Sequence, residues 1–486
     1  MQIPIKSITR GSNTNVSPLI HPIDQPYLMN GCNNAWRIGA LTKDTGYTIV
    51  GAQIEANKSI LGHYNFRQAP GTEKELATMD DATSDDTQLF YRTSGSWTEI
   101  GAAETAWANV ATAKVEMESF IGYCFFVGHS SVDGFLPVGS LTGTTFSTST
   151  NVTSMPQAKY IKRYKGQLWV ANCKSGGTEY PYRLYKSSVP SAGAITWAPA
   201  TDFLDVDYSD EITGLETAWG RLIAFTEYKM WIYDGSSFTD PYETGCSSHR
   251  TIKKSGPYML WCDVNGVQVS SGGQPKNISG EIYNLYMAGN PRNYFAEVVD
   301  EQYFLYIGNI TVGDVSYTNL VAIFDIGKSI WWVREMAEQM TTFARFNDSG
   351  LMRLHMGTAS GKVMNKGKYT DSTLLKSDNG SDISSEFELA PFHLDSLDAF
   401  KSLEAAIFYA DRPGGVKMYA RVLDNNQRIV TDYLPIGELT QFINSFDVDV
   451  NDGVMLQLKG EETGQNEYWS FLGYSLDIQL DGKIPK

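Results

Sequence analysis

The sequence contains few of the residues that usually build metal centres and disulfide frameworks. Its 486 residues include five cysteines and six histidines. The cysteines are scattered along the chain and form no C-x-x-C pair: Cys32, Cys124, Cys173, Cys246 and Cys262. An odd number of scattered cysteines argues against a structural zinc site and against a disulfide framework. We therefore expect all five to be small, buried, apolar residues.

Positive charge is also scarce. The chain has 39 lysines and arginines against 55 aspartates and glutamates, a formal net charge of −16 at pH 7. Gripping a nucleic acid needs clustered positive charge that displaces counterions from phosphates, so this composition excludes a general nucleic-acid-gripping surface. Residues 1–6 (MQIPIK) do not open a secretory signal, and no apolar run approaches the length of a membrane-spanning segment. We expect a soluble protein that is synthesised in the cytosol.

Sequence motifs of the common enzyme classes are missing. No histidine lies within four residues of another, and there is no G-x-S-x-G elbow, no P-loop and no G-x-G-x-x-G between a strand and a helix. Residues 93–98 (TSGSWT) resemble a sialidase Asp-box but lack the aspartate. A propeller glycosidase, which needs only two facing carboxylates, is the enzymatic alternative. We predict a protein that is not an enzyme, with no catalytic, cofactor-binding or metal-binding residues and no cofactor.

Two acidic segments resemble calcium loops without completing one. Residues 205–211 (DVDYSDE) could gather oxygen ligands for calcium, but their alternation also fits an exposed strand edge that leads into a turn. Residues 447–453 (DVDVNDG) open like an EF-hand. Their sixth position is Asp452 where that loop needs glycine, and the twelfth is Leu458 where it needs glutamate. The second segment is therefore better explained as a hairpin turn with solvated carboxylates.

Strand and turn residues, in contrast, are abundant. The 44 glycines, 27 tyrosines and 22 phenylalanines suit many short strands joined by tight turns. Residues 258–269 (YMLWCDVNGVQV) show the local unit, in which an apolar strand, a polar turn and a second strand follow one another. Asparagine and glycine tolerate the positive φ of a type I′ turn, so we predict a β-hairpin with Asn265 and Gly266 at its turn.

The same unit recurs along the chain. Seven strand centres serve as equivalent points: Leu89, Phe125, Trp169, Ile223, Leu260, Leu305 and Arg353. Their mean spacing of about 44 residues is near the ~40–50 residues of a propeller blade. A meander of three or four strands cannot bury both faces of its sheet alone, so such units stack radially. A chain of unrelated β-meanders is the alternative.

We therefore predict an all-β protein in which residues 58–375 form a degenerate β-propeller of about seven blades. Residues 376–486 change to alternating apolar and polar positions, which predicts a separate C-terminal β-sandwich. Residues 1–57 carry scattered prolines and little periodicity. They indicate an extended N-terminal arm that becomes ordered on a neighbouring subunit or on another partner. The last part of the arm, residues 38–50, is expected to form strands that close the ring by pairing with the last blade.

Two groups of motifs resemble a known family. The first is residues 30–47 (NGCNNAWRIGALTKDTGY), in which an asparagine-containing strand precedes G-x-L-x-K and a glycine. The second is the ordered series 230–235 (MWIYDG), 245–252 (GCSSHRTI), 265–267 (NGV) and 275–279 (PKNIS). Over residues 30–340 the chain resembles the β-propeller tail proteins of short-tailed bacteriophages, the tail nozzle or tail hub subunits. It departs from them at Lys43 and Asp44, where many relatives carry a basic pair and proline.

The resemblance implies a structural virion protein without catalytic residues. Such proteins form an oligomeric ring, expected to be a hexamer, around the DNA-exit channel below the portal and the head-to-tail adaptor. The implied partners are further copies of the chain, the adaptor and portal complex, and tail fibre or spike proteins. Genomic DNA passes during ejection without sequence-specific binding. The implied location is the virion, in the phage tail, after synthesis in the host cytoplasm.

The net charge is compatible with a conduit, because an acidic lumen repels phosphate groups and lets DNA slide. The alternative function is a receptor-binding or carbohydrate-binding tail protein. A conduit subunit should oligomerise through large side surfaces. A receptor-binding protein should instead bind host glycan as an isolated chain.

Overall fold

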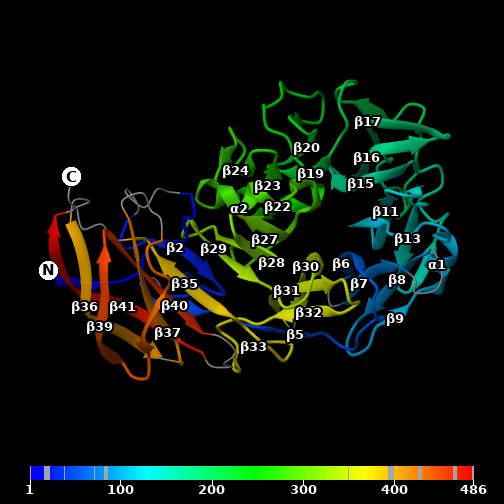
Figure 1. Cartoon of the computed structure of the whole chain (residues 1–486). Coiled ribbons are helices and arrows are strands. Elements are labelled where there is room, and N and C mark those ends of the chain that lie inside the picture. The colour runs from blue at the N-terminus through cyan, green and yellow to red at the C-terminus, as the bar shows by residue number, and fades with distance from the viewer. Residues whose placement is uncertain are drawn as a thin grey trace.

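A computed structural model of the chain describes residues 2–15, 22–37, 39–69, 72–80, 86–348, 350–391, 399–412, 414–424, 429–462 and 468–483. Antiparallel strands dominate it, which confirms the predicted all-β fold. A ring of small sheets lies beside a two-sheet sandwich (Figure 1). No helix within the described ranges is long and apolar enough to cross a membrane.

Seven sheets follow one another along residues 60–366, and each corresponds to one propeller blade. The first blade contains β6 (Ile60–Ala69), β7 (Thr72–Asp80), β8 (Thr87–Arg92) and β9 (Thr98–Glu99). The second contains β10 (Lys114–Phe120), β11 (Tyr123–Ser130), β12 (Gly134–Phe135), β13 (Gly139–Thr142) and β14 (Thr145–Ser147). The third contains β15 (Gln157–Tyr164), β16 (Gln167–Ser175), β17 (Thr178–Lys186) and β18 (Phe203–Asp205). The fourth and fifth are β19 (Gly214–Ala218), β20 (Arg221–Phe225) and β21 (Met230–Tyr233); and β22 (Lys253–Ser255), β23 (Tyr258–Asp263), β24 (Gly266–Ser270) and β25 (Lys276–Asn277). The sixth is β26 (Phe295–Val299), β27 (Gln302–Val312), β28 (Val315–Asp325) and β29 (Ile330–Glu335), and the seventh contains β30 (Met340–Asp348), β31 (Leu351–Thr358) and β32 (Val363–Lys366).

Short helices lie between some of these strands. They are α1 (Gly101–Ala106), α2 (Tyr283–Ala288) and the 3₁₀ turns η1 (His249–Thr251), η2 (Gly280–Ile282) and η3 (Pro291–Asn293). Apolar clusters fill the spaces between neighbouring blades, as expected for sheets that cover one another.

The ring closes through a strand that precedes the first blade. Strand β5 (Tyr47–Ile49) pairs antiparallel with β32, so that Ile49 lies opposite Met364. Beyond β5 the same sheet continues into β33 (Ser377–Asp378) and β34 (Ser381–Asp382). The seventh blade therefore takes an outer strand from residues 38–50, the segment for which the sequence predicts this role.

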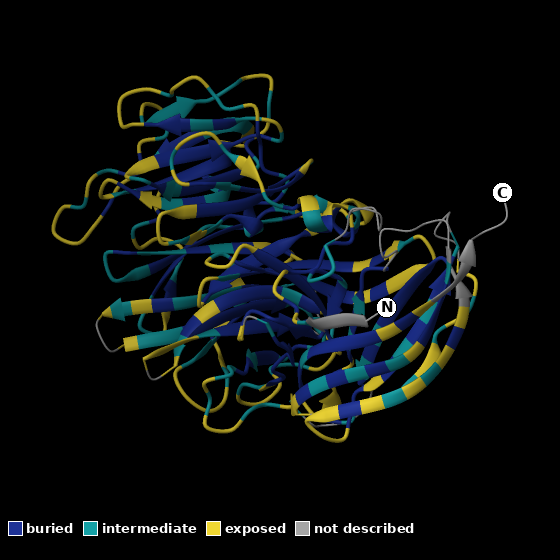
Figure 2. Cartoon of the chain, turned by 90° about the vertical axis from the view of Figure 1, so that its left-hand side faces the viewer, coloured by how far each residue is buried: buried dark blue, intermediate teal, exposed yellow. Residues whose placement is uncertain are grey.

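The second module is a sandwich of two sheets, with buried residues along its facing strands and exposed ones toward its surface (Figure 2). One sheet contains β3 (Cys32–Asn33), β4 (Leu41–Lys43), β41 (Ser470–Lys483), β36 (Ala399–Arg412) and β39 (Ile443–Gly453), with β1 (Gln2–Lys6) paired to β41. The other contains β2 (Pro26–Asn30), β35 (Ser385–Leu389), β40 (Met455–Glu462), β37 (Lys417–Leu423) and β38 (Leu434–Glu438).

The N-terminal segment differs here from the extended arm predicted for residues 1–57. Strand β1 pairs with β41, β2 lies between β29 and β35, and β4 joins β3 to β41. Met29, Cys32 and Leu41 are fully buried in the sandwich core. The strands that cover them come from the last third of the chain, so the segment is ordered by its own chain rather than by a neighbour.

One continuous sheet joins the two modules. Asn30 of β2 pairs in parallel with Val333 of β29, which makes a nine-stranded sheet from blade six and half of the sandwich. Adjacent strand residues point to opposite faces. Accordingly, Trp331 packs in the core of blades five and six, and Trp332 packs in the core shared with the sandwich. Both indoles are 1% exposed, so both faces of β29 are covered.

Buried ion pairs reinforce the same junction. Lys43 pairs with a glutamate of β40, and Asp44 pairs with Arg334 of β29 and Lys366 of β32, each at 3.1 Å. Arg334 is fully buried and also pairs with Asp378. The ion pairs of Lys43 and Asp44 therefore connect the N-terminal segment to both modules.

The hairpin predicted at residues 258–269 is present, but its turn lies one residue earlier than predicted. Asp263 pairs with Gly266, which leaves Val264 and Asn265 as the turn. The Asp263 carboxylate accepts a hydrogen bond from the backbone N–H of Asn265 at 2.6 Å, and this local bond sets the position of the turn. Glycine is still required at 266, because its φ is 142° and a Cβ there would lie 2.1 Å from Ser279 Oγ.

Candidate functional site

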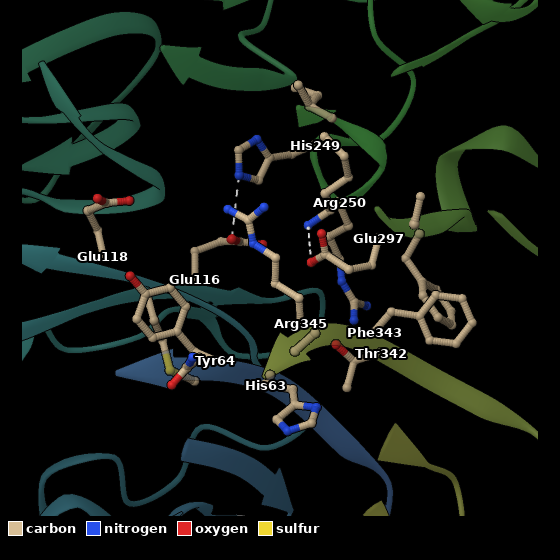
Figure 3. A pocket seen from close by; sticks show the side chains of 18 of the residues that line it. His63, Tyr64, Glu116, Glu118, His249, Arg250, Glu297, Thr342, Phe343 and Arg345 are labelled. Atoms are coloured by element: carbon tan, nitrogen blue, oxygen red, sulfur yellow. Dashed lines mark ion pairs between the residues drawn. The ribbon is translucent and has the colours of Figure 1, made fainter. Parts of the chain in front are cut away.

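The first strands of the seven blades surround a cavity of about 570 Å³ (Figure 3). Every blade contributes residues to its lining. The charged lining residues comprise five glutamates and seven cations: Glu73, Glu116, Glu118, Glu216, Glu297, Arg67, Lys162, Arg163, Arg250, Lys253, Lys254 and Arg345. The cavity thus carries a formal charge of +2, counting histidine as neutral, in a chain of formal charge −16.

Ion pairs link neighbouring blades around this cavity. Lys162 of the third blade lies 4.0 Å from Glu118 of the second and 3.2 Å from Glu216 of the fourth. Glu216 also pairs with Lys254 of the fifth blade at 3.0 Å. These strands belong to separate sheets, so the side chains supply polar contacts that no backbone hydrogen bond provides.

Among the described residues, the series of ion pairs continues to the sixth blade and does not reach the seventh. Lys253 lies 3.5 Å from Glu297 of β26. On the same strand, Phe295 contacts Phe343 of β30, with ring centroids 4.9 Å apart. Glu297 lies two residues after Phe295, and Arg345 lies two residues after Phe343. Glu297 and Arg345 are therefore at a similar level of the channel. Arg345 extends into the cavity (Figure 3), but no described carboxylate lies within 4.0 Å of it.

Two other lining arginines also lack a described carboxylate within ion-pair distance. Arg163 follows Lys162 on β15 and is exposed. Arg250 donates a hydrogen bond to the Thr341 carbonyl oxygen at 2.7 Å, and its guanidinium lies 5.0 Å from the ring centre of Phe295. Burial lowers the pKa of Arg250, and the charge of Glu116 opposes this effect.

His249 lines the cavity as a neutral imidazole. Its Nδ1 accepts a hydrogen bond from the backbone N–H of Leu215 at 3.3 Å, so the ring proton is on Nε2. Nε2 faces Glu116 at 3.4 Å. His249 and Arg250 both belong to the 245–252 motif, which therefore contributes to the channel as well as to the turn before β22.

The ion pairs of Glu216 predict acid sensitivity. Burial would raise its pKa, but the charges of Lys162 and Lys254 outweigh burial and lower the pKa from 4.5 to about 2. Because the folded-state pKa is lowered, this stabilisation is complete above pH ~4.5 and is lost as the pH falls through about 2. Glu216→Gln should lower the free energy of unfolding by roughly 3 kcal/mol at pH 7 and have little further effect at pH 2.

Denaturant titrations of both proteins from pH 7 to pH 2 would measure this difference. Glu179→Gln serves as the control, because Glu179 is exposed and lies outside the channel lining. A Glu216→Gln profile parallel to that of the wild type would show that the channel ion pairs contribute nothing to acid sensitivity.

A second cluster of titratable groups lies where the last blade meets the first. The buried Glu75 carboxylate accepts hydrogen bonds from His63 at 2.7 Å, His355 at 2.5 Å and Arg92 at 2.9 Å. Burial raises the pKa of Glu75, but the hydrogen bonds from both histidines outweigh it and hold the pKa well below its usual range. The buried apolar cluster at this seam is small: Ile60, Ala77 and Val363. Of the three partners of Glu75, His355 belongs to blade seven, so the Glu75–His355 hydrogen bond joins blades seven and one.

Two histidines and a glutamate are also residues that bind zinc, and one ligand atom from each of His63, Glu75 and His355 lies within 4.8 Å of the others. Two observations favour a hydrogen-bonded carboxylate instead. Arg92 places a positive charge on the other carboxylate oxygen. His63 Nδ1 is buried without a hydrogen-bond partner, whereas a metal-bound histidine almost always donates its second N–H.

Removal of metal ions is accordingly expected to leave the fold intact. Dialysis against EDTA should change the melting temperature by less than about 2 °C, because the Glu75 cluster is complete without a cation. Metal analysis of the purified protein should find less than one equivalent of zinc. A fall in melting temperature of tens of degrees, restored by zinc, would identify the cluster as a structural metal site.

The residues that sequence patterns single out lie outside both clusters. All five cysteines are free and buried, as predicted. In the segment 205–211, Asp205 pairs with Arg183 at 2.5 Å and Asp207 pairs with Lys229 at 3.4 Å. These carboxylates bind cations of the chain itself. The segment 447–453 forms the end of β39, where it leads into the turn before β40.

The chain is distantly similar to two solved structures, at a level too low to carry an argument. No protein-family model and no curated protein matches the chain. The Neurospora crassa Pan2 WD40 domain is 10% identical, with a TM-score of 0.41, over 69% of this chain and 97% of that chain. BBS1N, in a mercury-soaked complex with ARL6DN, is 9% identical, with a TM-score of 0.42, over 68% of this chain and 99% of that chain. Similarity at this level carries no argument about function.

Proposed function

We propose that this chain is a structural virion protein, the tail nozzle or tail hub subunit of a short-tailed bacteriophage. Six copies form a ring around the DNA-exit channel, below the portal and the head-to-tail adaptor and above the tail fibres or spike. The proposal starts from the resemblance in residues 30–47 and 230–279. It assigns no catalytic role to any residue.

The nine-stranded sheet that joins blade six to the sandwich carries the proposal. A conduit subunit must keep its shape while DNA passes under pressure. A continuous hydrogen-bonded sheet, with both faces of β29 buried and Arg334 of that strand paired with Asp44, makes the propeller and the sandwich one body. A module that only presents a binding surface has no need for such a junction.

The sandwich also has a surface suited to contacts between copies. Its sheets end in the edge strands β38 and β39. Exposed apolar residues gather on these strands and beside them: Ile429, Val430, Leu434, Phe442 and Ile443. Edge strands with apolar side chains favour association. We assign part of the ring contact to this edge, within a total of more than the ~2,000 Å² typical of permanent interfaces.

The DNA would pass between subunits rather than through a propeller. The major groove of DNA alone is about 12 Å wide. The propeller cavity measures only about 570 Å³, and ion pairs such as Lys162–Glu216 line it. In the proposed ring the lumen is therefore formed by the outer surfaces of six subunits.

Native mass spectrometry and electron microscopy of the purified full-length chain test the proposal. We expect closed rings, and we expect Phe442→Glu combined with Ile443→Glu to give monomers with an unchanged melting temperature. Val132→Glu is the matched control, because Val132 is an exposed apolar residue of blade two, 81% exposed and far from the sandwich edge in the fold. A wild-type chain that stays monomeric and binds host glycan would contradict the proposal and support the receptor-binding alternative.

Truncation is a poor substitute for these surface variants. Deleting residues 1–30 removes β1 and β2, including Met29 from the sandwich core. Loss of assembly in that variant would follow from a damaged fold and would not identify an interface.

A further inference from the structure

The charges of the propeller channel do not balance. Four of its five glutamates lie within 4.0 Å of a lysine or arginine, whereas Glu116 has only His249 within that distance among the described residues. The neutral His249 adds no charge. Three lining cations have no described carboxylate within 4.0 Å: Arg163, Arg250 and Arg345. Together with Glu116, the one lining carboxylate without a described cation at that distance, they account for the formal excess of +2.

These three arginines come from different parts of the ring. Arg163 belongs to blade three, Arg250 precedes the first strand of blade five, and Arg345 belongs to blade seven. Arg345 extends into the cavity, and Arg250 follows its wall (Figure 3), with the guanidinium against Phe295 and the Thr341 carbonyl oxygen. No two of the three are neighbours in sequence, so their convergence on one cavity is a property of the fold.

The surroundings of Arg250 favour the binding of an anion in the cavity over filling by water alone. The Phe295 and Phe343 side chains form an apolar part of the wall beside Arg250. Charged hydrogen bonds strengthen where apolar walls exclude water. A guanidinium presents its donors as a planar fork that matches the oxygens of phosphate or carboxylate. The volume of about 570 Å³ lies in the range of small-molecule sites.

We propose that the propeller channel binds a small oxyanion with two negative charges, recognised by Arg163, Arg250 and Arg345. Hydrogen phosphate, a phosphate monoester and a small dicarboxylate share this chemistry. The bound anion neutralises the channel and joins blades three, five and seven through one ligand. This site is independent of the proposed role in a phage tail.

Isothermal titration of the full-length chain tests the site, with inorganic phosphate, glycerol phosphate and succinate as separate probes. All titrations use constant ionic strength, with chloride as the balancing anion. We expect saturable binding of one equivalent, with a Kd below about 1 mM for at least one probe. Binding by phosphate and glycerol phosphate would assign a phosphate ligand, and binding by succinate alone would assign a dicarboxylate.

The variant Arg163→Gln combined with Arg345→Gln should weaken this binding at least tenfold, because it removes two of the three guanidinium groups. Both side chains are exposed, so the unliganded melting temperature should stay within about 2 °C of the wild type. The control is Arg221→Gln, which changes an exposed arginine on β20 outside the channel lining. Absence of saturable binding for all three probes, or equal binding by the double variant, would overturn the proposal.

Discussion

Replacing Glu75 with alanine should destabilise the protein by about 3–5 kcal/mol, the range measured when one partner of a buried ion pair is removed. The substitution leaves Arg92 and the two histidines at the seam between blades seven and one without their shared acceptor. The apolar cluster there is too small to compensate. Equilibrium unfolding in urea at pH 7, followed by tryptophan fluorescence, measures the loss.

Glu73 provides the matched control on the same strand. It lies two residues before Glu75, and its partner Arg67 is 59% exposed at a distance of 3.7 Å. A surface pair of this kind contributes about 0–1 kcal/mol, so Glu73→Ala should have a small effect. If Glu75→Ala costs no more than this control, the seam does not depend on the polar cluster.

Replacing Asp44 with alanine should have a comparable effect, about 3–5 kcal/mol, at the junction of the two modules. Burial raises the pKa of Asp44, but Lys366 and Arg334 outweigh burial and lower it, so the carboxylate is ionised in the folded protein. Without it, Lys366 loses its carboxylate at 3.1 Å and Arg334 loses one of its two carboxylate partners, with Asp378 remaining. Differential scanning calorimetry should show a lower melting temperature.

Asp411→Ala is the control for this substitution. The Asp411 carboxylate pairs with Arg37 at 3.1 Å, but their side chains are 49% and 55% exposed, so its loss should cost less than about 1 kcal/mol. Equal melting temperatures for the Asp44 and Asp411 variants would contradict a structural role for the buried network.

The propeller was predictable because each blade repeats a strong local pattern. The repeated aromatic strands predict seven equivalent residues, one for each blade. Six of these seven residues lie on the second strand of a blade. The exception is Leu89, which lies on the third strand, β8, of the first blade. Register within a blade was less predictable, since Asp263 moved the turn that Asn265 and Gly266 indicate.

The N-terminal strands were not predictable for a different reason. Strands β1 to β4 are two to five residues long, and apart from the β3–β4 pair their partners are β29, β35 and β41. A short strand between distant partners needs no alternation of apolar and polar residues, because residues far away in the chain cover both of its faces. The low periodicity of residues 1–57 therefore led to the prediction of an extended arm, whereas these residues form part of the sandwich.

Neither polar cluster could be recognised from local motifs. His355 lies 280 residues from Glu75 in sequence, and only ring closure brings them together. The channel left a weak signal, because charged residues recur in the first strands of successive blades: Glu116, Glu118, Lys162, Glu216, Lys254 and Glu297. In a strand expected to be buried, such charged residues indicate a polar channel. From the sequence alone they cannot be told from the exposed face of a strand, because only the closed ring brings them together.

Electron microscopy of virions that contain this chain, with an antibody against its sandwich, tests the central claim most directly. The account predicts a closed ring of six antibody-labelled subunits around the DNA channel, below the portal and adaptor. In each subunit the propeller and the sandwich should have the fixed relation set by the nine-stranded sheet. Labelling at the tips of fibres, or as single copies away from the channel axis, would contradict it.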